Sequence, residues 1–84
     1  MKVSVDLSLY PLSEDYVPVI IDFIHRLQAH PGIDIVRTAL STQLFGDYAT
    51  VMRVVGEELE RVFREHGRAV LVAKIALGDV REGG

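Results

Sequence analysis

Polar and apolar side chains alternate along the first ten residues of the chain. The odd-numbered positions are apolar, namely Val3, Val5, Leu7 and Leu9. Because successive side chains of a β-strand point to opposite faces, this alternation predicts a strand with one buried and one displayed face. We expect the strand to end at Tyr10-Pro11, since proline has no amide hydrogen to donate to a neighbouring strand.

The last predicted strand, residues 69–77, is apolar on both faces. Val70 and Val72 lie on one face, and the other face carries Leu71, Ala73, Ile75 and Leu77. A sheet face that is polar on one strand and apolar on another is seldom left to water. We therefore expect the displayed face of the sheet to be a covered, working surface.

The first of two predicted helices follows the first strand. Asp15 is the expected N-cap, which places Pro18 at the third helical position, where an amide hydrogen has no partner within the helix. His30-Pro31-Gly32 ends the helix. Its apolar stripe recurs at spacings of three and four residues, at Val17, Ile20, Ile21, Ile24 and Leu27.

The second predicted helix begins after Asp47, its N-cap, and ends at Gly67, a residue suited to the left-handed conformation just past a helix. Gly56 lies inside this helix and costs it about 1 kcal/mol relative to alanine. Close packing against a strand or a partner would explain this glycine. The expected buried stripe is Val51, Val54, Val55, Leu59, Val62 and Phe63.

The segment between the helices, residues 33–46, is too long for one strand and has no helical stripe. We read it as two strands, residues 33–39 and 41–45, joined by a very tight turn. The usual Asn-Gly or Asp-Gly turn signal is missing, so a single bent or bulged strand is the alternative.

The predicted order is strand, helix, strand, strand, helix, strand within one domain, residues 1–84. Two βαβ halves with right-handed crossovers give the ferredoxin-like α+β fold, βαββαβ, with a four-stranded antiparallel sheet and both helices on one face. Residues 79–84 form a polar tail that we expect to be frayed.

The bare face of this sheet carries the candidate functional side chains. The first strand contributes Ser4, Asp6, Ser8 and Tyr10, and the last contributes Val70, Val72, Lys74 and Ala76. The third strand adds one alternating set, either Ser41, Gln43 and Phe45 or Thr42 and Leu44. Leu44 suits the helix side, so we favour the first set.

Charge and composition narrow the possible partners. Nine basic and twelve acidic residues give a net charge of −3, and the basic residues are scattered, which argues against nucleic acid. The longest apolar runs have five residues, far short of the roughly 20 that cross a bilayer, so no membrane insertion is expected. The N-terminus carries no secretion signal, and we expect a cytoplasmic protein.

Size and cysteine content favour self-association. A domain of 84 residues buries only about two-thirds or less of its extended surface on folding. No cysteine is present to form a disulfide, a thiolate metal site or a catalytic thiol. Burial of further surface between copies of the chain is the remaining source of stability.

The residues offer little for catalysis or metal binding. His25, His30 and His66 have no carboxylate or second histidine at ligand spacing, so we expect no metal and no other cofactor. Ser41-Thr42 has no histidine nearby in sequence and no glycine elbow, so we do not expect an enzyme. An enzyme would need a base within hydrogen-bond reach of these hydroxyls. Asp6, in mid-strand, is either solvated or receives a donor group from a ligand.

Three segments of the chain carry a resemblance to a known family: residues 5–12 (VDLSLYPL), 15–18 (DYVP) and above all 40–47 (LSTQLFGD). They resemble the YkoF-like family, which binds thiamine and its hydroxymethylpyrimidine moiety. The resemblance implies a ferredoxin-like domain, present as a tandem pair or as a single copy that self-associates through its sheets. Since this chain holds one copy, it implies a homo-oligomer, a dimer or a tetramer, and binding in salvage or transport without catalysis.

The expected ligand site combines this resemblance with the strand geometry. An aminopyrimidine could meet the Asp6 carboxylate and nearby hydroxyls, while a thiazolium cation favours an aromatic face. The expected ligand-binding residues are Asp6, Ser8, Tyr10, Ser41, Thr42, Gln43 and Phe45. The alternative is a structural or regulatory oligomerisation module with no metabolite ligand, whose sheet face is flat and fully covered.

Overall fold

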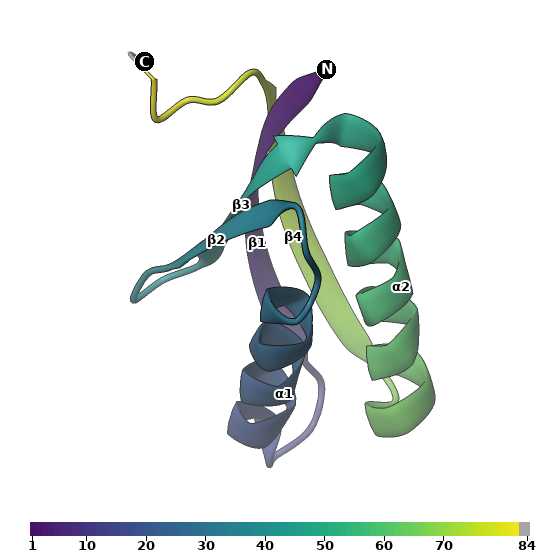
Figure 1. Ribbon diagram of the computed structural model, residues 1–84. Coiled ribbons are helices and arrows are strands. Elements are labelled where there is room, and N and C mark those ends of the chain that lie inside the picture. The colour runs from purple at the N-terminus through teal and green to yellow at the C-terminus, as the bar shows by residue number, and fades with distance from the viewer. Residues whose placement is uncertain (83–84) are drawn as a thin grey trace.

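A computed structural model describes residues 1–82 of the chain (Figure 1). The elements, in order, are β1 (Lys2–Pro11), α1 (Tyr16–Gln28), β2 (Ile33–Arg37), β3 (Thr42–Asp47), α2 (Tyr48–His66) and β4 (Ala69–Leu77). The strands form one antiparallel sheet in the order β2-β3-β1-β4, and both helices cover the same face. The ferredoxin-like βαββαβ fold predicted from the sequence is therefore confirmed.

The alternation of β1 places its odd-numbered side chains in the core. Val3, Val5, Leu7 and Leu9 are all buried, and they pack with Leu44 of β3 and the valines of α2. Burial of an aliphatic side chain of this size contributes about 1.5–3 kcal/mol. The buried face of β1 thus forms the hydrophobic surface against which both helices pack.

The stripe predicted for α1 is partly wrong. Ile24 and Leu27 are buried as expected, but Val17 is 51% exposed and Ile21 is 36% exposed. Val19 and Phe23 take their places in the core. Residues 17–24 are apolar at nearly every position, so periodicity alone leaves the rotation of the helix about its axis open, and packing against β1 decides it. Asp15 occupies the N-cap, but its side chain makes no capping hydrogen bond.

Helix α2 follows its prediction more closely. Asp47 caps it by accepting a hydrogen bond from the Ala49 N–H at 3.2 Å, and Gly67 ends it with a φ of +86°. The four predicted valines are buried and Leu59 is partly buried, but Phe63 is 47% exposed. Glu58 is buried in its stead.

The buried Glu58 carboxylate has two partners. Its Oε2 lies 2.7 Å from Nε2 of His30, and its Oε1 accepts a hydrogen bond from Nε of Arg61 at 3.1 Å. A buried charge of this kind is costly unless it is paired and hydrogen-bonded. His30 lies just after α1, so the pairing also joins the end of α1 to α2.

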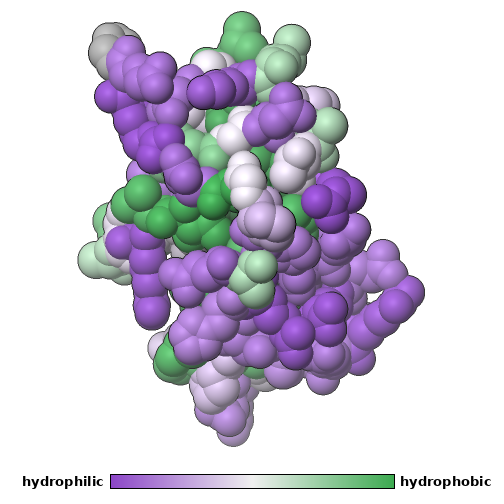
Figure 2. Space-filling model, in the orientation of Figure 1, coloured by the Kyte–Doolittle hydropathy of each residue, from purple (hydrophilic) through white to green (hydrophobic). Residues whose placement is uncertain are grey.

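The outer surface of α2 is a solvated, charge-paired face. Arg53 pairs with Glu57, and Arg64 pairs with Glu60, each four residues apart. Figure 2 shows hydrophilic residues over the helices, with hydrophobic side chains gathered in a band across the middle, at the level of β2 and β3.

Residues 33–47 form two strands, as predicted, although their bounds differ from the expected ones. β2 ends at Arg37 and β3 begins at Thr42. The Thr38 N–H donates to the Ser41 carbonyl at 2.9 Å, so only Ala39 and Leu40 lie in the loop. Thr38 Oγ1 accepts from the N–H of Leu40 at 3.3 Å and of Ser41 at 3.0 Å. This hydroxyl stabilises the turn in place of the missing Asn-Gly signal.

The first residues of the tail are hydrogen-bonded to β1. Ser4 Oγ donates to the Gly78 carbonyl at 2.7 Å and accepts from the Val80 N–H at 3.0 Å. The Arg81 guanidinium stacks over the Phe45 ring at 3.9 Å and pairs with Asp34 of β2 at 3.1 Å. Residues 79–82 therefore fold back over the bare face of the sheet. Residues 83 and 84 of the expected frayed tail lie outside the described residues.

Close packing does not explain Gly56. A Cβ added there would meet no described atom within 4 Å, whereas a Cβ on Gly46 would lie 3.1 Å from the Gly32 carbonyl oxygen and 3.2 Å from Cγ2 of Val51. The close approach that requires a glycine is thus at Gly46, where β3 passes the start of β2 and of α2.

We predict that Gly56→Ala stabilises the protein by up to about 1 kcal/mol, because alanine lowers the entropic cost of the helix and meets open space. Urea unfolding followed by circular dichroism measures the change. Gly46→Ala is the matched control and should destabilise. A Gly56→Ala variant less stable than the parent would mean that another surface packs on this helix face.

Candidate functional site

Strand register decides which face each predicted site residue occupies. Asp6 lies opposite Gln43 of β3 and Lys74 of β4, and Ser4 lies opposite Phe45. These side chains share the bare face, as expected. Thr42 is opposite Leu7, faces the helix layer and is buried. The predicted set therefore divides between the two faces of the sheet.

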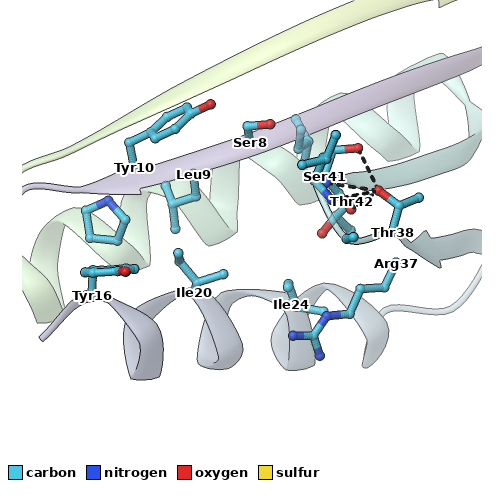
Figure 3. A pocket seen from close by; sticks show the side chains of 14 residues that line it. Ser8, Leu9, Tyr10, Tyr16, Ile20, Ile24, Arg37, Thr38, Ser41 and Thr42 are labelled. Carbon is cyan, nitrogen blue, oxygen red and sulfur yellow. Dashed lines mark hydrogen bonds between the residues drawn. The ribbon is translucent and has the colours of Figure 1, made fainter.

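The larger of the two cavities lined by predicted site residues lies where β1 runs past the start of β3, between β1, α1 and the β2–β3 turn (Figure 3). Its volume is about 470 Å³, within the range of small-molecule sites. Of the predicted residues, it is lined by Ser8, Tyr10, Ser41 and Thr42. Four of the seven predicted residues thus meet at one cavity.

The two ends of this cavity differ in chemistry. Tyr10 and Tyr16 lie at one end, and Thr38, Ser41 and Arg37 lie at the other (Figure 3). Between them, Ile20 and Ile24 of α1 form an apolar wall across from Leu9 of β1. From one end of the cavity to the other, the lining is therefore first aromatic, then apolar and then rich in hydroxyl groups.

Asp6 acts on this cavity through Ser41 and does not line it. Ser41 Oγ donates a hydrogen bond of 2.5 Å to Asp6 Oδ1 and lies 3.3 Å from Thr38 Oγ1. Asp6 was expected either to be solvated or to receive a donor from a ligand, and its donor comes from the chain itself. The carboxylate fixes the direction of the Ser41 hydroxyl at the edge of the cavity.

A smaller cavity holds the remaining predicted residues. Asp6, Gln43 and Phe45 line it with Lys74 and Val80, and its volume is about 170 Å³. It lies on the bare face, beside the place where the tail residue Arg81 stacks on Phe45. This volume is below the usual range for a ligand of drug-like size. The seven predicted residues therefore belong to two separate cavities.

The tail residue Asp79 has a perturbed acidity. Hydrogen bonds from Arg81 Nε at 2.9 Å and Nη2 at 2.7 Å hold the pKa of Asp79 at about 2, below its ordinary value of 3.8. The same pairing raises the pKa of the Arg81 guanidinium. Arg81 also stacks on Phe45, so this ion pair helps to hold the tail over the smaller cavity.

Sequence reasoning missed the residues that α1 and the turn bring to the larger cavity. They are Tyr16, Ile20, Ile24, Arg37 and Thr38. We expected the site on the bare face alone, whereas the cavity opens at the side of the sheet. The signal available in the sequence was the unequal length of two strands. β1 is longer than β3 by four residues, so β3 cannot pair with the whole of β1.

One further cluster appears between the helices. Ligand atoms of Asp22, Glu65 and His66 lie within 4.8 Å of one another. Arg26 Nε already pairs with Asp22 Oδ2 at 3.2 Å, and His66 Nε2 lies 3.6 Å from the same oxygen. The cluster is accounted for as an ion-pair network that joins α1 to the end of α2.

The fold and the side cavity define a ferredoxin-like domain with a cavity beside its sheet. A family model, the YKOF-related family, matches residues 2–78, and the chain belongs to this family. The resemblance seen in the sequence is thus confirmed. Among curated proteins, no sequence matches the chain.

Three solved structures are similar to this chain over nearly its whole length. Protein SP2199 from Streptococcus pneumoniae is 29% identical, with a TM-score of 0.87, over 99% of this chain and 93% of that one. A "putative thiamine biosynthesis/salvage protein", TM0486 from Thermotoga maritima, is 24% identical, with a TM-score of 0.83, over 93% and 85%. Hypothetical protein MJ1052 from Methanocaldococcus jannascii is 21% identical, with a TM-score of 0.81, over 99% and 87%. The last two establish the fold alone.

Within residues 1–82, neither helix is long and apolar enough to cross a bilayer.

We predict that acid releases the tail. The folded pKa of Asp79 lies below its unfolded value, so the pairing contributes fully above about pH 4 and is lost as the pH falls towards 2. The Asp79 carboxyl carbon and the Val80 amide, followed by NMR, should change together with a midpoint near 2. Asp79→Asn should abolish the transition. A carboxyl that titrates at its ordinary value would show that the pair does not form in solution.

Proposed function

We propose that this protein binds thiamine, or its hydroxymethylpyrimidine moiety, in the larger cavity and that it acts in salvage or transport without catalysis. The observation that carries the proposal is the cavity of about 470 Å³ with its aromatic and hydroxyl ends. Membership of the YKOF-related family supports it, as does the thiamine-related name of the similar Thermotoga protein.

The chemistry of the cavity suits the two rings of thiamine. A thiazolium cation is stabilised over an aromatic face at the tyrosine end of the cavity, since aromatic faces attract cations. A neutral pyrimidine carries donors and acceptors that can meet the hydroxyls of Thr38 and Ser41 at the other end. The cation would then lie away from Arg37, whose positive charge is at the hydroxyl end.

The proposed ligand residues differ in part from those expected from the sequence. Ser8, Tyr10, Ser41 and Thr42 keep the role, and Tyr16 and Thr38 join them. Asp6 becomes a positioning residue for Ser41. Gln43 and Phe45, which line the smaller cavity, no longer belong to the proposed site.

Two alternatives are less well supported. Ser41 has a carboxylate within hydrogen-bond reach, which an enzyme would need. However, an activated serine normally uses a histidine that a third group orients, and no histidine lines either cavity within the described residues. A purely structural module would need no cavity of this size.

The cytoplasmic location stays a prediction.

We predict that thiamine and hydroxymethylpyrimidine release or absorb heat on titration and raise the melting temperature of the chain. Ile20→Trp should weaken binding by about tenfold or more, because the larger ring fills the cavity. Ile21→Trp is the matched control and should retain binding, because Ile21, the next residue on α1, does not line the cavity. Absence of both heat and thermal stabilisation with both compounds would refute the proposed function.

We also propose that copies of this chain associate through the bare face of the sheet. On β4, Val70 and Val72 of this face are half exposed, and Ile75 and Leu77 on the opposite side are exposed as well. β4 is an edge strand of nine residues whose only charge is Lys74. An exposed apolar surface of this kind invites a second chain to cover it.

A second copy is the partner that fits this surface best. The chain is small enough that its own core is limited. On β4 the face carries only the charge of Lys74, so two copies can meet along this strand without several like charges coming together. The bare face reaches the larger cavity at Ser8 and Tyr10, so a second copy there would also flank the ligand.

We predict that Val72→Glu shifts the protein to a smaller species, because a carboxylate on this surface would be buried without a partner in the assembly. Light scattering after size-exclusion chromatography measures the mass. Val17→Glu is the matched control, since Val17 is similarly exposed on α1, outside the sheet face, and should leave the mass unchanged. A parent protein that is monomeric at all concentrations would refute the association.

A further inference from the structure

The ladder between β1 and β3 stops before β1 does. Its last pair is Leu7 with Thr42, whereas β1 continues to Pro11. In the same register, Leu9 would face residue 40. Leu40 is instead in the two-residue loop of the β2–β3 turn, where its N–H donates to Thr38 Oγ1, and its side chain is almost fully exposed. The turn thus removes the strand that would have paired with Leu9.

The direction of the Leu9 main-chain groups follows from the alternation of the ladder. In an antiparallel pair, residues exchange hydrogen bonds at every second position. The Met1 carbonyl accepts from the Tyr48 N–H at 2.8 Å, so odd-numbered residues of β1 bond towards β3. The Lys2 carbonyl accepts from Gly78 and the Leu12 N–H donates to Arg68, so even-numbered residues bond towards β4. Leu9 therefore directs its N–H and C=O to the side that β3 has left.

Both of these groups open into the larger cavity. Leu9 lines the cavity, and Figure 3 places it between Tyr10 and Ser8 on β1 and across from Ile20. Within residues 1–82, no hydrogen bond joins its N–H or C=O to another group. Main-chain polar groups that face a cavity are paired either with water or with a ligand that enters it.

We propose that the Leu9 main chain recognises a planar nitrogen heterocycle that carries an amino group next to a ring nitrogen. The Leu9 N–H donates to the ring nitrogen, and the amino group donates to the Leu9 carbonyl oxygen. The ligand thereby continues the ladder in the place of the missing β3 residue. This inference rests on the proposed function, since it requires that the ligand occupy the larger cavity.

The surroundings of Leu9 suit such a ring. An N–H and a C=O of one residue in a strand point to the same side, which matches an acceptor and a donor on adjacent ring positions. Ile20 and Ile24 can cover a flat ring, and Tyr10 and Tyr16 lie at one end of the same space. Main-chain recognition leaves the Asp6 carboxylate to Ser41, where the structure has it.

This mode of binding makes the site specific for heterocycles that carry the amino group. A pyrimidine that lacks the group leaves the Leu9 carbonyl oxygen without a donor, which costs more than the loss of an apolar contact. The deaminated analogue should bind weaker than hydroxymethylpyrimidine by about tenfold or more.

Amide hydrogen exchange on the full chain tests the inference directly. With hydroxymethylpyrimidine bound, exchange at the Leu9 amide should slow by about tenfold or more. The Leu7 amide, already bonded to β3, is the internal reference and should change little. Binding that leaves the Leu9 amide unprotected would overturn this inference and leave the proposed function intact. Absence of any binding would overturn both.

A synthetic chain with an ester in place of the Leu9 amide provides a second test. The ester removes the N–H and keeps the side chain, so affinity should fall by about tenfold while thermal unfolding changes little. The matched control is an ester at Leu71, which lies directly opposite Leu9 and whose N–H points to the free edge of β4. Equal affinities of the two esters would overturn the inference.

Discussion

The two-sided hydrogen bonding of β1 is the constraint on which the rest of the structure depends. Even-numbered residues of β1 bond to β4 and odd-numbered residues bond to β3, while the odd-numbered side chains enter the core. A shift of one residue in either ladder would bring Asp6 and Ser8 under the helices. The register therefore fixes which side chains form the core and which face stays bare. It also fixes which main-chain groups of β1 have no partner beyond Leu7, where the ladder with β3 stops.

The cavity exists because β3 begins only at Thr42, opposite Leu7, while β1 continues to Pro11. Thr38 closes a tight turn with its hydroxyl, and the chain returns before it can cover the last residues of β1. Helix α1 packs across from this open end and supplies the opposite wall through Ile20 and Ile24. At the other end of the sheet, the tail covers the space beside Phe45, held by Ser4 and by the Asp79–Arg81 pair. One end of the sheet is thus closed by the chain itself, and the other offers a site.

Much of the fold could be predicted, and the site could be predicted only in part. Alternation in β1, caps at Asp47 and Gly67 and the valines of α2 gave local signals that packing obeys. The rotation of α1 gave no such signal, because apolar residues surround that helix, and Phe23 entered the core in place of Ile21. Ser8, Tyr10, Ser41 and Thr42 were found because they lie near the end of β1 or the turn. Tyr16, Arg37 and Thr38 were missed because only the packing of α1 and the turn brings them to the cavity.

By itself, the sequence determined the order of the elements, the buried face of β1 and the family, because each is written in spacing and side-chain type over short distances along the chain. Only the tertiary structure decided that Asp6 is held by Ser41 and that the predicted residues belong to two cavities. The physical reason is that these facts depend on where one strand stops beside another. Strand ends are set by the balance of turn, ladder and helix packing across segments more than 30 residues apart, a balance that no local pattern records.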